Sequence, residues 1–193
     1  MLSAEYRDID KRKIVIDDRE LSARLGRLCS HTDPDLCTIV NSVIIESEPK
    51  YAAALCEISV NDGEVALGFG KVRSAALARC LKGFSEAYVF AVTLGIGVDR
   101  LISKISAVSR AEAFIYDAVA SALAEAVCDA AQRDIVGKRD ASFRFAVGYG
   151  DFSLEHQGPL LDYLGAPIYL GITLTDTGLM VPIKTITAVV GVK

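Results

Sequence analysis

A long alanine-rich segment, residues 110–134, constrains the fold more than any other part of the chain. It predicts one helix from about Arg110 to Asp134, and its small side chains let another helix or a sheet pack closely against it. Asp117, Ser121 and Glu125 recur at intervals of four, so they form one stripe along this helix. The stripe is either the solvated face of an otherwise buried helix or an acidic surface that faces a cationic ligand.

The rest of the chain predicts a mixed architecture. Further helices are expected over residues 19–29 and 153–164, whereas apolar residues alternate over 168–174 and 186–192 and predict two closing strands. Since helices and strands do not alternate strictly, the predicted fold class is α+β, with a mixed, largely antiparallel sheet and packed helices. No low-complexity linker or break in composition occurs, so residues 1–193 are predicted to form a single domain.

Composition and charge exclude several classes of protein. A net charge of −4 and an isoelectric point near 5.2 argue against nucleic acid as a partner. Hydrophobic residues make up 51% of the chain, but the longest nearly apolar run, residues 87–98, is too short to span a bilayer. Acidic residues follow the first methionine closely, which is unlike a secretory leader. A cytoplasmic protein without a membrane contact is expected.

Neither a metal site nor a nucleophile stands out in the sequence. The five cysteines include no C-x-x-C pair, and the chain has only two histidines. The cysteines are predicted to be buried apolar residues, as free cysteines usually are. A catalytic Cys/His pair stays possible, because residues distant in sequence can meet in the fold, but no pattern points to one. We therefore predict no metal and assign no catalytic residue.

Two Gly-x-Gly segments, Leu67–Arg73 and Leu94–Arg100, share the pattern Leu-Gly-x-Gly-x-x-Arg. Each follows a strand-like run and is predicted to open a helix. Backbone amides at such a turn can bind a phosphate. Neither segment completes the dinucleotide fingerprint or the phosphate loop, since arginine stands where a third glycine is required. Tight turns are the favoured interpretation, and a phosphorylated ligand is the alternative.

Arg144 opens a second informative segment, which ends at Tyr149 and carries the small residues Ala146 and Gly148 at alternate positions. A guanidinium offers a planar fork of donors that suits a carboxylate, and a flat ring can lie against a backbone of small residues. A single arginine after a loop is more commonly a surface charge or an ion-pair partner.

These segments resemble the S-adenosylmethionine-binding activation domain of cobalamin-dependent methionine synthase and the small free-standing proteins similar to it. Arg-x-Ala-x-Gly-Tyr at 144–149 is similar to the family's Arg-Pro-Ala/Ser-Pro-Gly-Tyr, and Leu123–Ala126 is similar to its Leu-Ala-Glu-Ala. Leu174–Asp176 and Met180–Pro182 resemble its Leu-Thr-Glu and Met-x-Pro. The resemblance is strongest over residues 88–192.

The resemblance implies a role for each matching residue. Arg144 would hold the methionine carboxylate, and the backbone at Ala146 and Gly148 would contact adenosine. Tyr149 would lie near the corrin, and Glu125 would belong to the ligand site.

Two further parts of the site are implied less directly. Thr175 and Asp176 lie on a predicted hairpin that would form the wall beneath the ligand. The family's N-terminal aspartate could be Asp8, Asp10 or Asp17.

The expected function is binding of S-adenosylmethionine and support of reductive remethylation of cobalamin. The cobalamin would be carried by a separate corrinoid methyltransferase or methionine synthase core, since no Asp-x-His-x-x-Gly motif is present. A flavodoxin-like or ferredoxin-like protein would supply the electron. Whether the chain counts as an enzyme stays open, although it would be a component of a methyltransferase activity. The alternatives are a non-catalytic S-adenosylmethionine or corrinoid-protein binding module and a small enzyme for a phosphorylated ligand.

Overall fold

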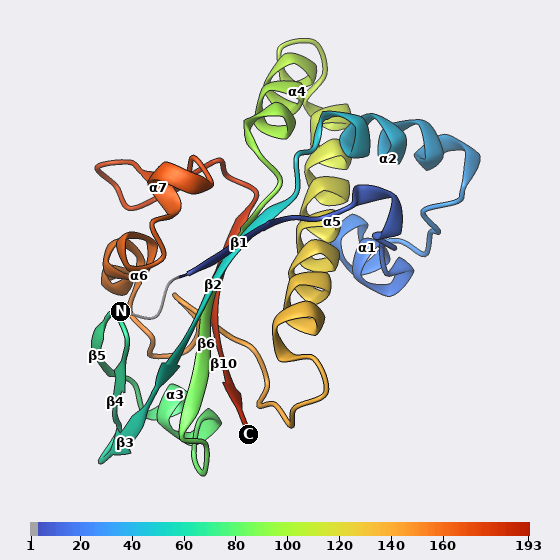
Figure 1. Ribbon diagram of the computed structural model, residues 1–193. Helices are drawn as coiled ribbons and strands as arrows, with labels where there is room; N and C mark the ends of the chain where they lie inside the picture. The colour runs from blue at the N-terminus through green and yellow to red at the C-terminus, as the bar shows by residue number, and fades with distance from the viewer. Residues whose placement is uncertain (1–3) are drawn as a thin grey trace.

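A five-stranded antiparallel sheet crosses the middle of the computed structural model, which describes residues 4–193 (Figure 1). In spatial order its strands are β1 (Glu5–Asp8), β2 (Lys50–Glu57), β6 (Glu86–Thr93), β10 (Thr185–Val192) and β7 (Phe145–Ala146). Every neighbouring pair of these strands is antiparallel. The α+β fold with a largely antiparallel sheet, predicted from sequence, is therefore confirmed, as is the closing strand at 186–192.

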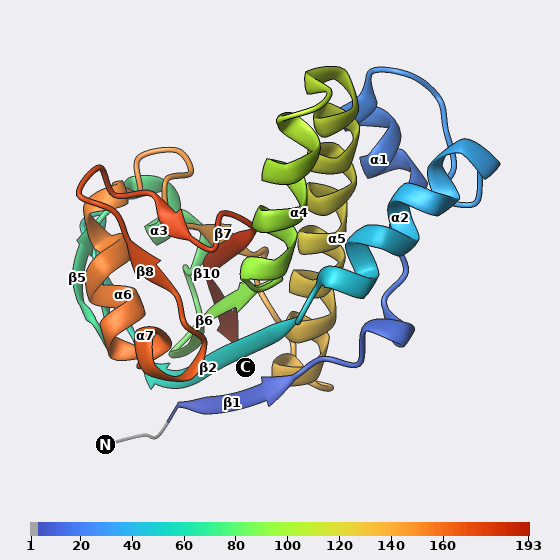
Figure 2. The same cartoon turned by 90° about the horizontal axis from the view of Figure 1, so that it is seen from above.

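Helices α1 (Asp18–Leu25), α2 (Pro34–Glu46), α4 (Ile96–Ser106) and α5 (Arg110–Val136) gather on one side of this sheet (Figures 1 and 2). The hydroxyl of Ser109 caps α5 by accepting from the Glu112 N–H at 3.2 Å. With 27 residues α5 is about 40 Å long, and its prediction from the alanine-rich segment is confirmed. It forms the axis around which α1, α2 and α4 pack.

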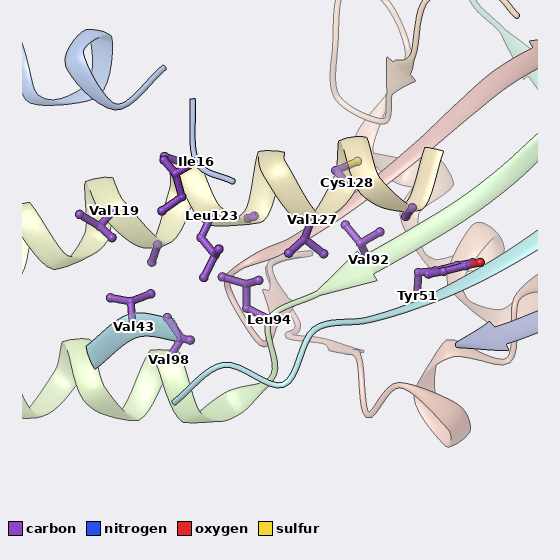
Figure 3. Packing of buried hydrophobic residues seen from close by; sticks show 14 of the residues in the cluster. Ile16, Val43, Tyr51, Val92, Leu94, Val98, Val119, Leu123, Val127 and Cys128 are labelled. Atoms are coloured by element: carbon purple, nitrogen blue, oxygen red, sulfur yellow. The ribbon is translucent and has the colours of Figure 1, made fainter. Parts of the chain in front are cut away.

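The main core lies between α5 and the sheet (Figure 3). Leu123, Val127 and Cys128 of α5 are fully buried, with Ile16 packed on one side of the helix and Leu94 on the other. Because strand residues alternate between faces, a second core fills the opposite face of the sheet. The central strands are thus apolar on both faces.

The opposite face is covered by shorter elements. These are the sheet of β3 (Ser59–Asn61), β4 (Glu64–Leu67) and β5 (Gly70–Arg73), helix α3 (Ala75–Cys80), the 3-10 turn η2 (Leu154–His156), helices α6 (Gln157–Tyr163) and α7 (Ala166–Tyr169), and the hairpin of β8 (Thr173–Leu174) and β9 (Met180–Val181). A further 3-10 turn, η1 (Lys11–Lys13), lies apart from these elements, between β1 and α1 in the chain. The helix predicted over 153–164 corresponds to η2 followed by α6.

Three local predictions are wrong. Residues 168–174 do not form one strand, since 166–169 are helix α7 and only Thr173–Leu174 is extended. The first Gly-x-Gly segment opens no helix, because it forms the turn between β4 and β5. Helix α1 ends at Leu25 rather than at residue 29, since Gly26 adopts a left-handed conformation with φ 65°.

The second Gly-x-Gly segment does open a helix, as predicted, at the N-terminus of α4. A Cβ atom at Gly97 would lie 2.3 Å from the backbone oxygen of Glu46, so glycine is required there by the close approach of the end of α2. The backbone of Glu46 and Glu48 lies against this helix end, together with the Glu46 carboxylate. The turn therefore serves packing, and the Glu46 carboxylate disfavours a phosphate.

The start of α1 is held by a group of hydrogen bonds. Asp18 accepts from the His31 backbone N–H at 2.8 Å, from the Ser30 hydroxyl at 2.7 Å, and lies 2.6 Å from the His31 ring nitrogen Nδ1. These donors, the His31 backbone first, lower the pKa of the Asp18 carboxyl to about 2. The loop before α2 is thereby tied to α1, which carries one wall of the candidate site.

Within residues 4–193 no helix is long and apolar enough to cross a membrane.

Candidate functional site

A cavity of about 380 Å³ lies beside the middle of α5, between this helix and the start of α1. Its volume is within the range of about 300–1,000 Å³ that is usual for small-molecule sites. It is lined by Val15, Asp17, Glu20, Ala122, Glu125, Ala126, Asp129 and Arg144. The small residues of α5 leave the space, and charged side chains supply most of its polar surface.

Arg144 reaches this cavity from the segment just before β7. One terminal nitrogen of its guanidinium donates to Asp129 at 2.7 Å and to Gln132 at 3.1 Å, and the other donates to Glu125 at 2.8 Å. The Arg144 side chain is 20% exposed. The structure thus brings together Arg144 and Glu125, two residues that the resemblance placed in one site.

Four carboxylates line the cavity against one guanidinium. Asp17 caps α1 by accepting from the Arg19 N–H at 2.8 Å, and Glu20 pairs with Arg24 at 2.6 Å. Arg24 also lies 3.9 Å from Glu125. Even when Arg24 is counted, negative charge exceeds positive charge, so the site favours a ligand that carries a net positive charge.

Of the three aspartates that the sequence left as candidates, Asp17 is the one that lies at this cavity. It lines the same cavity as Arg144 and Glu125, whereas Asp8 and Asp10 line separate hollows beside β1. Asp17 was one of three candidates from the resemblance, whereas Glu20 had no signal in the sequence, because it is more than a hundred residues away from Arg144. Asp129 had a signal, since it continues the stripe of Asp117, Ser121 and Glu125 by one further step of four.

Ala146, Gly148 and Tyr149 follow Arg144 along the edge of the sheet and do not line this cavity. Ala146 pairs with Ala188 of β10, and the Val147 N–H donates to the Thr187 oxygen at 3.3 Å. Phe145 and Val147 stand where the similar motif has prolines, and here pairing with β10 keeps the backbone extended. Gly148 has φ 87° and starts a turn that its N–H closes on the Phe152 oxygen at 2.8 Å.

Tyr149 sits in this turn with 69% of its surface exposed. Its ring meets Phe145 edge-on, with the ring centroids 5.5 Å apart. The underlying Phe145 is buried in the second core, so the tyrosine has a rigid support while its outer face stays accessible. That arrangement suits contact with a large partner molecule.

Thr175 and Asp176 lie at the tip of the β8–β9 hairpin. The turn is closed by the Thr175 N–H, which donates to the Leu179 oxygen at 2.9 Å, and both residues are exposed. The hairpin packs on α6, where the Gln157 side-chain amide donates to the Met180 sulfur at 2.8 Å. Neither Thr175 nor Asp176 lines the cavity at Arg144, so their predicted place in the wall of the site stays a prediction.

The chain leaving this hairpin does reach α5. Lys184, only 8% exposed, donates to Asp117 at 2.7 Å and to Ser121 at 2.8 Å. It lines a second hollow of about 180 Å³ that shares Glu125 with the first. Two members of the predicted stripe therefore hold a buried lysine, and only Glu125 faces the cavity. The stripe is thus partly solvated, since the Asp117 side chain is 53% exposed, and the cation facing Asp117 is a side chain of this protein.

Cys128 lies on α5 beside Arg144 and is fully buried. Burial raises the pKa of its thiol to about 12, so it stays protonated and acts as a packing residue. Cys56 is buried as well, but Cys37 on α2 is exposed, so the expectation that all five cysteines are buried is wrong. Among residues 4–193 there is no cluster of three or more His, Cys, Asp and Glu side chains that could hold a metal ion.

Neutralising Glu125 tests whether this carboxylate attracts the ligand. For a cationic ligand we expect Glu125→Gln to lower affinity roughly three- to tenfold while the stability falls by no more than about 1 kcal/mol. Glu112→Gln removes the same charge from the exposed first turn of α5 and should leave binding unchanged. Titration calorimetry and a melting curve on the same samples measure both effects, and equal affinity in the two variants would place Glu125 outside the binding site.

Comparisons with known proteins identify the fold. No protein-family model and no curated protein matches the chain. The crystal structure of the MetH reactivation domain bound to AdoHcy superimposes with a TM-score of 0.74, covering 98% of this chain and 78% of that one. Sequence identity over this match is 13%. The chain therefore has the fold of that reactivation domain, and this fold extends over residues 4–87 as well, where sequence resemblance was weak.

Proposed function

We propose that this protein binds S-adenosylmethionine and supports the reductive remethylation of cobalamin held by a separate corrinoid methyltransferase or methionine synthase core. The observation that carries the proposal is the cavity at Arg144, where one guanidinium lies among four carboxylates. S-adenosylmethionine has one carboxylate and two positive groups, the α-ammonium and the sulfonium. Its charges complement those of the cavity. The fold shared with a domain crystallised with AdoHcy, the demethylated form of this ligand, supports the same ligand class.

The chemistry requires few groups from the protein. When cobalamin is bound by the partner, its reduced cobalt supplies the nucleophile for the methyl group of the sulfonium. The residues of this chain then have to bind the donor, orient its methyl group and exclude water. Arg144 would fix the carboxylate, and the acidic residues Asp17, Glu20 and Glu125 would stabilise the positive groups. One electron per cycle would come from a flavodoxin-like or ferredoxin-like donor.

Tyr149 is the residue proposed to face the corrin. Its exposure and its support on Phe145 favour contact with the partner rather than with the bound adenosyl ligand. We expect Tyr149→Ala to keep S-adenosylmethionine affinity within about threefold, because its side chain does not line the cavity, while remethylation slows at least about tenfold. Tyr169→Ala removes another exposed tyrosine, on α7, and serves as the control.

The test mixes the cognate partner in its inactive cob(II)alamin form with a one-electron reductant, S-adenosylmethionine and this protein, and records methylcobalamin by its absorbance. Faster remethylation in the presence of this protein supports the proposal. Binding of S-adenosylmethionine without any acceleration would instead assign a non-catalytic binding module. A parallel titration with ATP and NAD addresses the third alternative, since binding of these alone would indicate a site for phosphorylated ligands.

A further inference from the structure

Asp129 accepts a hydrogen bond from a guanidinium nitrogen of Arg144 that a ligand carboxylate would need. Its Oδ1 lies 2.7 Å from one terminal nitrogen of Arg144, and Glu125 holds the other terminal nitrogen at 2.8 Å. The two carboxylates differ in freedom, because the Asp129 side chain is 55% exposed and that of Glu125 is 36% exposed. Glu125 is also near Arg24. Asp129 is therefore the one that a ligand carboxylate can displace at lower cost.

Displacement has a consequence for Asp129 itself. Arg144 is the only side chain in the described residues 4–193 to which Asp129 is bonded. Two other acidic residues of the cavity have partners of their own, since Asp17 caps α1 and Glu20 is paired with Arg24. Once a ligand carboxylate takes its place on Arg144, Asp129 is left as an unpaired anion directly beside the newly bound carboxylate.

A plain carboxylate ligand thus faces two penalties at this position. It has to replace an existing ion pair, and it then stands next to a like charge. An α-amino acid head group offsets both penalties, because its ammonium is on the carbon adjacent to the carboxylate and can pair with the displaced Asp129. The short distance between Arg144 and Asp129 matches the short separation of the two charges in such a head group.

We infer that Asp129 is a specificity-determining residue that makes the site select ligands with an α-amino acid zwitterion over ligands with a carboxylate alone. The inference rests on the proposed function, since it assumes that the adenosyl ligand places its carboxylate at Arg144. In the unliganded protein Asp129 occupies the part of Arg144 that the ligand carboxylate needs. In the complex it accepts a hydrogen bond from the ligand ammonium. Glu125 keeps its own bond to Arg144 throughout and holds the guanidinium in place.

Two adenosyl ligands that differ in one group provide the test. S-adenosylhomocysteine has the full amino acid head, and 5′-S-(3-carboxypropyl)-5′-thioadenosine is the same molecule without its α-amino group. Titration calorimetry gives the dissociation constants of both for the unmodified protein and for three variants: Asp129→Asn, Asp129→Glu and the charge-matched control Glu112→Gln. Melting curves verify that each variant is folded.

The quantity that decides is the ratio of the two dissociation constants. We expect the unmodified protein to prefer S-adenosylhomocysteine about tenfold or more, and Asp129→Asn to reduce this preference roughly three- to tenfold, chiefly by tighter binding of the deaminated ligand. Asp129→Glu should retain most of the preference, and Glu112→Gln all of it. If Asp129 had a purely structural role, its substitution would weaken the binding of both ligands equally and leave the ratio unchanged.

The outcomes separate this inference from the proposed function. If S-adenosylhomocysteine binds and the ratio in Asp129→Asn stays within about twofold of that in the unmodified protein, the role of Asp129 is refuted while the ligand class stands. If neither adenosyl ligand binds the unmodified protein, the proposed function fails and the inference fails with it.

Discussion

Replacing Arg144 with alanine is expected to weaken S-adenosylmethionine binding roughly tenfold to more than a hundredfold. A charge-assisted hydrogen bond to a carboxylate contributes about 1.5–3 kcal/mol, and truncation at alanine removes the whole fork of donors. Among the described residues 4–193, Arg144 is also the only one that brings a guanidinium to the lining of the acidic cavity, so the variant leaves the ligand carboxylate facing carboxylates such as Glu125 and Asp129. Titration calorimetry with S-adenosylmethionine measures the loss.

The control has to separate binding from folding, because Arg144 also holds Glu125 and Asp129 together in the protein itself. Arg144→Lys keeps the positive charge but lacks the planar fork. Its affinity for S-adenosylmethionine should fall between those of the unmodified protein and Arg144→Ala. A melting curve shows whether each variant is folded. Unchanged affinity in a folded Arg144→Ala protein would remove the ligand assignment of this cavity.

Truncating Leu123 to alanine is expected to lower the free energy of unfolding by about 2–5 kcal/mol. Leu123 is fully buried on α5 and lies between Ile16 and the end of β6, as Figure 3 shows. The elements packed on α5 include α1, α2 and α4, and the close packing of this core lets it relax only partly into the space left behind. Denaturant-induced unfolding of both proteins gives the difference.

Leu28→Ala is the matched control for this substitution. Leu28 is 95% exposed, so its truncation should change the unfolding free energy by no more than about 0.5 kcal/mol. A similarly small change for Leu123→Ala would mean that α5 is not packed between the sheet and α1. Since α5 and α1 form opposite walls of the cavity, Leu123→Ala should also weaken ligand binding even where the protein remains folded.

The sequence determined the elements whose patterns are local and long. The alanine-rich stretch specified α5 almost to its ends, because many residues contribute consistently to its helix propensity. Alternating apolar residues specified β10, and the resemblance of two segments predicted that Arg144 and Glu125 lie in one place, where the structure pairs them. Short segments were less certain. Residues 168–174 alternate as a strand does, but Pro167 and the left-handed Gly165 start a short helix instead.

Only the tertiary structure decided which charges meet. Sequence periodicity placed Asp117 and Glu125 on one stripe of α5, but it could not show that a buried Lys184 pairs with the first and Arg144 with the second. Ion pairs act between side chains that the fold brings together, and their partners leave no periodic trace in the chain. For the same reason Asp17 became identifiable as a wall of the cavity only once α1 was seen packed beside α5. The kinds of charged group in the site were fixed by sequence, whereas their pairing, and with it the preference for a cationic ligand, arises from the packing of α1, α5 and the sheet.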